Sequence, residues 1–329
     1  RSSAASDVYK RQLGGLLALG ACGGAKNDDQ APVDKTADVS TTHQVVEEED
    51  AAKAFLKIQY LHEQSQNEFN AYIEKISNQR DLKNNPQKLA QIEKSYAKKE
   101  AEITAALFQK IEALNVKNPD IKAYLELQKQ GLQASKELND HLQKLNKVAK
   151  TKKRRPEEKD LQHLQELSHQ VQKIELDLLQ KQIDMNDKFA KEIPEGQLKE
   201  FYQITHIQDL AYQKQIELAK NPPKPQNNGE SQEKKGKELL KSIIAVDREI
   251  TQKLGEIKLK DAEVAKLRDL AIDMANKKIA TAELVSSIPV GQRPSKKVAT
   301  RLQMAAKAAG DATNAFMEQR YQLLHRIGQ

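Results

Sequence analysis

Residues 241–274 read KSIIAVDREITQKLGEIKLKDAEVAKLRDLAIDM, and their apolar side chains recur in alternating steps of three and four. This spacing keeps the apolar side chains on one face of an α-helix, whereas a half-buried strand would place them at every second position. The repeat continues from residue 243 to residue 274 and predicts one long, coiled-coil-like helix. Its members are Ile243, Val246, Ile250, Leu254, Ile257, Val264, Leu267, Ala271 and Met274.

The same spacing recurs over most of the chain on both sides of this stretch. Further helices are expected over residues 55–76, 89–114, 121–148, 164–189, 198–210 and 298–323. The corners between helices are Asn84-Asn85-Pro86, Asn118-Pro119, Pro156, Pro194 and residues 286–294. No stretch alternates as a strand would, and short corners favour antiparallel neighbours. The sequence predicts an all-α fold, an elongated antiparallel helical bundle.

The composition is typical of long helices with narrow apolar stripes. Of the 329 residues, 38% are hydrophobic, 4% are aromatic and 31% are charged, which disfavours a pair of ordinary globular domains with thick cores. Gln128 and Ser135 interrupt the stripe of residues 121–148. They predict a loosely packed stretch, or room for a partner helix.

Charge is distributed unevenly along the chain. Residues 23–50 hold eight acidic residues against two lysines, a net charge of −6, whereas residues 51–329 carry +11. We expect the acidic stretch to be a disordered tether. The basic remainder either attracts anionic partners or is a solvated surface.

The stretch LGGLLALGACGG, residues 13–24, holds the only cysteine of the chain. It is shorter than the roughly 20 apolar residues that span a bilayer. A single cysteine forms neither an intramolecular disulfide nor a Cys-rich metal site. The tetrapeptide Leu19-Gly20-Ala21-Cys22 after a short apolar run resembles the lipobox of bacterial lipoprotein signal peptides.

The resemblance implies that the signal peptide is cleaved before Cys22, which then carries a thioether-linked diacylglycerol and an acyl chain. No other cofactor is expected. The residue after the cysteine is Gly23 rather than Asp, which resembles the pattern in lipoproteins that are sorted to the outer membrane. We therefore expect a chain that is anchored in the outer membrane and faces the periplasm. A buried structural cysteine and a redox cysteine are the alternatives, but nearby glycines disfavour a helix and no second cysteine is present.

Residues 1–12 resemble a translated sequencing adapter and are left out of the fold prediction. The alternative is a natural signal-peptide start, with Lys10 and Arg11 as its positive region. The predicted segments are the adapter-like and signal residues 1–21, a lipidated tether over 22–45, a helical bundle over 46–220, a linker over 221–236 and long helices over 237–329.

The sequence contains no nucleotide-binding glycine loop, no nucleophile elbow and no HExxH motif. We therefore expect no catalytic activity. The best local constellation is His163, Glu166 and His169 on one predicted helix, whose ExxH spacing occurs in di-iron bundles. A second ExxH is absent, and the alternative is a solvated polar face.

The densest basic run consists of Lys150, Lys152, Lys153, Arg154 and Arg155. Anionic lipid headgroups, lipopolysaccharide or cell-wall polymer are the expected partners, and a solvated helix corner is the alternative. No nucleic acid is expected, because no aromatic side chains interleave with these charges to stack on bases. Residues 293–329 form a second basic region.

The sequence thus predicts a lipid-anchored cell-envelope protein that acts as a non-catalytic binding or scaffolding module. It resembles the broad class of uncharacterised all-helical bacterial lipoproteins. Its partners would be the membrane, through the lipid, and other envelope proteins. Two alternatives stay open: a metal- or ligand-binding helical bundle, and a surface-exposed adhesin or host-factor binder.

Overall fold

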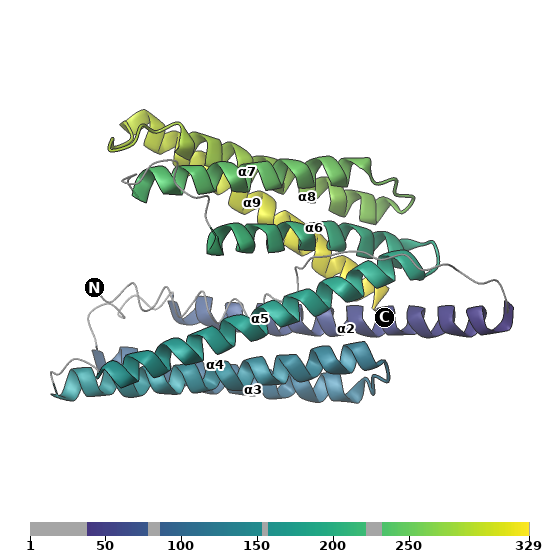
Figure 1. The fold of residues 1–329 in the computed structure, drawn as a ribbon, viewed down its shortest axis with the longest axis horizontal. Coiled ribbons are helices and arrows are strands. Elements are labelled where there is room, and N and C mark those ends of the chain that lie inside the picture. Colours follow the sequence, from purple (N-terminus) through teal and green to yellow (C-terminus); the bar gives the residue numbers. More distant parts are fainter. Residues whose placement is uncertain (1–37, 78–85, 153–156, 222–231, 329) are drawn as a thin grey trace. The chain divides into compact units, whose positions relative to one another are not determined.

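The computed structural model describes residues 38–77, 86–152, 157–221 and 232–328. Over these residues the fold is all-α, as predicted, and helices pack against one another within each unit (Figure 1). The described helices are α2 (Asp38–Ser77), α3 (Pro86–Ala113), α4 (Pro119–Lys152), α5 (Glu158–Glu192), α6 (Gln197–Lys220), α7 (Gln232–Glu256), α8 (Ala262–Ser286) and α9 (Lys296–Ile327).

The corners follow from the residues that the sequence places there. After α3, Asn115 adopts a left-handed backbone conformation with φ 48°, which asparagine tolerates better than most residues. The Asn118 side chain then accepts hydrogen bonds from the N–H groups of Asp120 and Ile121, at 2.9 and 3.2 Å, and so caps α4. Gly196 supplies a φ of 156° between Pro194 and α6. The predicted breaks at Asn118-Pro119 and Pro194 are confirmed.

The chain divides into two compact units. Unit 1 contains residues 58–182, and unit 2 contains residues 38–57 together with the described part of 183–328. Helices α2 and α5 contribute to both units, with the divisions after Lys57 and after Gln182. Of the linker predicted over residues 221–236, residues 222–231 lie outside the described residues, and residues 232–236 are the first residues of α7. Helices α6 and α7 pack together within unit 2.

In unit 1, α4 and α5 pack through a small apolar core. Its buried members are Ala134, Leu138, Leu167 and Val171, with Leu142, Leu164 and Ile174 packed against them. Helices α2 and α3 meet through the rings of Tyr72 and Tyr96, 5.9 Å apart in an edge-to-face arrangement. The room expected beside Gln128 is filled, because Gln128 is buried and contacts His62 of α2.

In unit 2, the prediction of a single helix over residues 243–274 is wrong. The structure has two helices, α7 and α8, which pack against each other and are separated by residues 257–261. The apolar pattern hides this break, because Ile257 and Val264 are seven residues apart and stay in phase. Asp261 causes it: its carboxylate accepts hydrogen bonds from the N–H groups of Glu263 and Val264, at 3.0 and 2.9 Å, and starts a new helix.

Aromatic side chains join α2, α5 and α6 in unit 2. The ring of Phe189 lies 6.1 Å from that of Phe55 and 5.0 Å from that of Tyr202, and all three are buried. The Tyr202 hydroxyl donates a hydrogen bond to the carbonyl of Ala52 at 2.6 Å. Gly328, just after α9, lies so close to Leu56 of α2 that a β-carbon there would be 3.3 Å from its side chain. The C-terminal end of α9 is therefore packed against α2.

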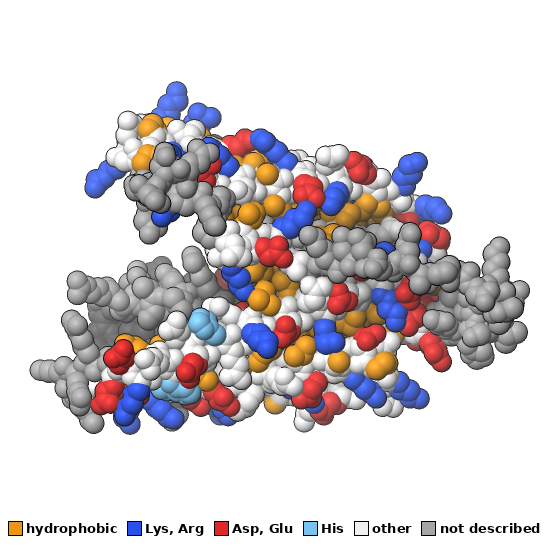
Figure 2. Space-filling view, in the orientation of Figure 1, with side chains coloured by type: hydrophobic (Ala, Val, Ile, Leu, Met, Phe, Trp, Pro, Cys, Tyr) orange, Lys and Arg blue, Asp and Glu red, His pale blue; other side chains and the backbone are white. Residues whose placement is uncertain are grey.

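The start of α2 lies earlier than expected. It begins at Asp38, so residues 38–45 of the predicted tether are helical, while the rest of the tether lies outside the described residues. Acidic and basic side chains are interspersed over the visible face of each unit (Figure 2). Within the described ranges no helix has an apolar stretch long enough to cross a membrane.

Candidate functional site

The predicted lipidation motif, Leu19, Gly20, Ala21 and Cys22, lies outside the described residues, as does the adapter-like segment. The same holds for most of the basic run. Lys150 and Lys152 fall in the last residues of α4, and Lys153, Arg154 and Arg155 follow it outside the described residues. The structure therefore provides no side-chain geometry for either predicted site.

The histidine constellation is described, and it lies on α5 of unit 1. His163, Glu166 and His169 are all exposed, and His163 Nδ1 is 3.6 Å from a carboxylate oxygen of Glu166. Successive residues of an α-helix are rotated by about 100° and rise about 1.5 Å. His163 and His169 are therefore turned about 120° apart and separated by about 9 Å along the axis. One ion cannot readily bind both.

A residue that the sequence analysis missed, His141 of α4, lies beside His163. Their ring centroids are 4.8 Å apart, with the rings nearly perpendicular. Because a carbonyl oxygen only accepts, the His141 Nε2 group donates its hydrogen bond to the backbone carbonyl of Asp160, at 3.0 Å. Nδ1 is then the unprotonated nitrogen of the neutral ring.

The pairing of these two histidines follows from the α4–α5 core, which fixes the register between the helices. Sequence alone gives no such register. In the described part of the chain, no group of three or more His, Cys, Asp or Glu side chains is arranged to hold a metal ion. The chemistry open to this surface is binding by two imidazoles, with water completing the coordination of a metal.

A second polar arrangement, in unit 2, centres on Glu200 of α6. Its side chain is buried, and its two carboxylate oxygens accept hydrogen bonds from the backbone N–H groups of Lys260 and Asp261, at 2.9 and 3.0 Å. These two residues form the turn between α7 and α8, where helical hydrogen bonding is interrupted. Glu200 therefore replaces the missing backbone acceptors.

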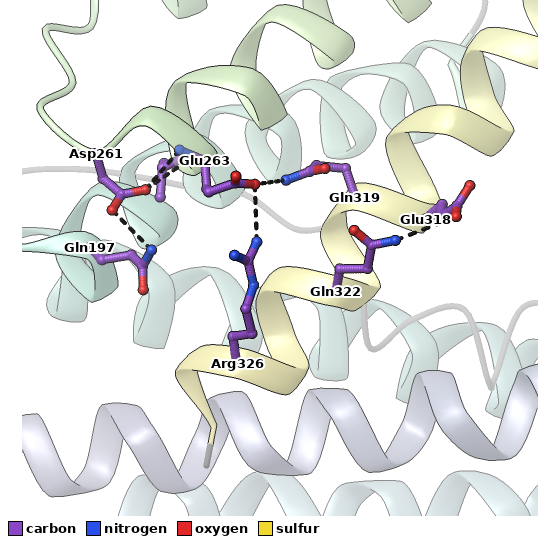
Figure 3. Close-up of polar contacts among 8 residues, drawn as sticks. Gln197, Asp261, Glu263, Glu318, Gln319, Gln322 and Arg326 are labelled. Carbon is purple, nitrogen blue, oxygen red and sulfur yellow. Dashed lines mark hydrogen bonds and ion pairs between the residues drawn. The ribbon is translucent and has the colours of Figure 1, made fainter.

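Asp261 and Glu263 extend this arrangement across unit 2 (Figure 3). Gln197 of α6 donates a hydrogen bond to Asp261 at 2.9 Å, and Glu263 accepts from Gln319 and Arg326 of α9 at 2.8 and 3.0 Å. Burial raises the pKa of Asp261, but the hydrogen bonds to its carboxylate outweigh that effect and lower the pKa. Hydrogen bonds from Gln319 and Arg326 lower the pKa of Glu263. Both groups act as carboxylate acceptors that join α6, α8 and α9.

In unit 1, the buried His62 of α2 faces Gln128 of α4. The His62 Nε2 atom lies 3.0 Å from the amide oxygen of Gln128, so the neutral ring donates this hydrogen bond. Burial lowers the pKa of His62 to about 4, and the hydrogen bond to Gln128 offsets this only in part. The ring is neutral near pH 7 and serves to join two helices.

Unit 2 contains a similar buried pair. The Asn186 side-chain amide of α5 donates a hydrogen bond to the Asp209 carboxylate of α6, and both residues are fully buried. Nearby on the same helices, His206 Nε2 lies 3.4 Å from the Asp187 carboxylate, and burial lowers the pKa of His206 despite that charge. The sequence predicted no site at Asn186, Asp187, His206 or Asp209. In so polar a chain, such side chains are expected to face solvent.

Comparisons of this chain with protein-family models, with curated proteins and with solved structures gave no significant match.

The buried His62 generates a pH dependence of stability. Its pKa is 6.5 in the unfolded chain and about 4 in the fold, so between these values the unfolded chain binds more protons. The stabilisation is complete above the unfolded pKa and is lost as the pH falls toward the folded pKa. Urea denaturation should record a free energy of unfolding that is about 2 kcal/mol lower at about pH 5 than at about pH 7. His62→Gln should remove this difference.

The exposed His163 provides the matched control, because His163→Gln should leave the loss between these pH values as in the wild type. Equal losses in the wild type and in His62→Gln would show that His62 titrates normally in the folded chain.

Proposed function

We propose that this chain is a lipid-anchored protein of the bacterial cell envelope that acts by binding or scaffolding, without catalysis. The observation that carries the proposal is the tetrapeptide Leu19-Gly20-Ala21-Cys22 at the end of a short apolar run. An acidic stretch and then long polar helices follow it. This is the order of parts in a protein that is held at a membrane by its first mature residue.

The use of the buried polar side chains supports a binding or scaffolding role. An enzyme needs acids, bases or nucleophiles that substrate can reach. Here His62, Glu200 and Asp209 are buried, and each is hydrogen-bonded to another helix or to a turn between helices. Such contacts stabilise one arrangement of the helices, which is what a scaffold requires.

A specific observation favours metal binding as a second candidate function. His141 and His163 bring two imidazole rings together on the surface of unit 1 from two helices. Imidazole nitrogens bind zinc, copper and nickel, and the two helices hold the rings in place through their shared core. In this proposal the ligands are His141 and His163 rather than the originally predicted His163, Glu166 and His169.

The lipid anchor is tested by Cys22→Ala in the full chain, expressed in a bacterium behind a complete signal peptide. The wild type should take up labelled fatty acid and partition into detergent. The variant should do neither, because the thiol that accepts the lipid is absent. Protease added to intact cells should leave the wild type uncut if it faces the periplasm.

The matched control is Ser40→Ala, which leaves Cys22 and the apolar run intact and should label like the wild type. Equal labelling and partitioning of Cys22→Ala and the wild type would contradict the anchor. Cleavage by protease in intact cells would instead favour the surface-exposed adhesin.

The metal proposal is tested by calorimetric titration of the full chain with Zn²⁺. His141→Ala and His163→Ala should each weaken binding by at least about tenfold, because each removes a ligand. His169→Ala should leave binding unchanged. Absence of binding by the wild type, or a loss confined to His169→Ala, would contradict the His141–His163 site.

A further inference from the structure

The turn between α8 and α9 and the first half of α9 form a basic surface in unit 2. Between Glu283 and Asp311 the sequence contains five Lys or Arg residues and no acidic residue. Four of them, Arg293, Lys296, Lys297 and Arg301, are exposed, and none has an ion-pair partner within the part of the chain that the structure describes. We call this part of unit 2, residues 284–310, the basic tip.

Hydrogen bonds from Lys237 and within the turn itself hold the turn of the basic tip. Lys237 of α7 donates to the carbonyls of Ser286 and Ile288 at the C-terminal end of α8, where unpaired carbonyls favour a cation. Gly291 allows the turn its φ of 78°, and the Ser295 hydroxyl accepts a hydrogen bond from Val298 N–H at 3.4 Å, at the start of α9. These contacts thus stabilise one conformation of the turn.

Exposed apolar side chains lie among these cations. Val285, Val290 and Met304 expose 41%, 46% and 69% of their surface, and they are half of the large hydrophobic residues exposed in the described ranges. On α9, Lys297, Arg301 and Met304 follow at steps of four and three and share one face. Figure 2 shows Lys and Arg side chains around hydrophobic ones at this end of unit 2 (upper left).

We propose that the basic tip docks onto an anionic lipid surface. Cations near such a surface are attracted to its headgroups, and apolar side chains beside them enter the boundary between headgroups and acyl chains. The tip carries both kinds of side chain on one turn and the adjoining helix face. A solvated surface accounts for the cations but not for Val290 and Met304 exposed among them.

The composition of the tip favours lipid over nucleic acid. Residues 284–310 contain no Phe, Tyr or Trp, the side chains on which unpaired bases stack. Exposed Val and Met side chains gain nothing from a phosphate backbone, whereas they lose contact with water when they enter a lipid interface.

The inference deepens the proposed function and rests on it in one respect, since a lipid anchor at Cys22 would keep the tip near a membrane. Its test removes that dependence. The full chain carrying Cys22→Ala has no lipid, so any vesicle binding reports the protein surface alone. Fatty-acid labelling tests the anchor separately.

The measurement is co-sedimentation with phosphatidylcholine vesicles, with and without phosphatidylglycerol. The unlipidated chain should bind only the anionic vesicles, and less at higher salt. Replacing Arg293, Lys296, Lys297 and Arg301 with Gln should lower the partition coefficient more than about a hundredfold, at about fivefold for each cation. Val290→Ser should lower it up to about tenfold at every salt concentration.

The matched control removes four exposed lysines of unit 1, by changing Lys117, Lys122, Lys136 and Lys144 to Gln, and should bind vesicles like the parent. Circular dichroism melting checks that each variant is folded. The proposal would be overturned if the unlipidated chain bound neutral and anionic vesicles equally or bound neither. It would also be overturned if the tip variant and the control variant lost vesicle binding to the same extent. Oligonucleotide binding that the tip variant loses, without vesicle binding, would assign the tip to nucleic acid instead.

Discussion

The buried carboxylate of Glu200, between α6 and the turn that joins α7 to α8, is the contact on which unit 2 depends. Its two oxygens accept hydrogen bonds from two backbone N–H groups of that part-buried turn, and a hydrogen bond to a charged group contributes about 1.5–3 kcal/mol. With both N–H groups satisfied, the chain reverses at residues 257–261, and α8 packs back on α7. The carboxylate thereby turns one continuous apolar pattern into two packed helices.

The remaining contacts of α8 and α9 build on this turn. Asp261, the residue that Glu200 holds, caps α8, and Glu263 in the first turn of that helix receives Gln319 and Arg326 from α9. Polar side chains therefore set the positions of helices whose apolar stripes are narrow. The same helices leave the α8–α9 turn exposed, with its cations and apolar side chains available to a surface.

Sequence periodicity was sufficient for the helical class and for corners with a local chemical cause, such as Asn118-Pro119 and Pro194. It failed at residues 257–261, because the apolar spacing remained in phase there and outweighed the local cap signal of Asp261. Glu200, which binds the same turn, lies 60 residues away in the sequence and gave no local signal. It also missed His141 beside His163, because that contact depends on the register between α4 and α5. The predicted lipidation motif is local in sequence, so predicting it needs no such register.

The most direct test of this account is Glu200→Gln, followed by hydrogen exchange and urea denaturation. The substituted amide keeps one acceptor but presents an N–H₂ group to a backbone N–H. We predict a loss of about 2 kcal/mol in the free energy of unfolding and faster exchange at the amides of Lys260 and Asp261, extending into α8. Unchanged exchange at both amides, with a loss below about 0.5 kcal/mol, would contradict the claim that Glu200 holds the turn.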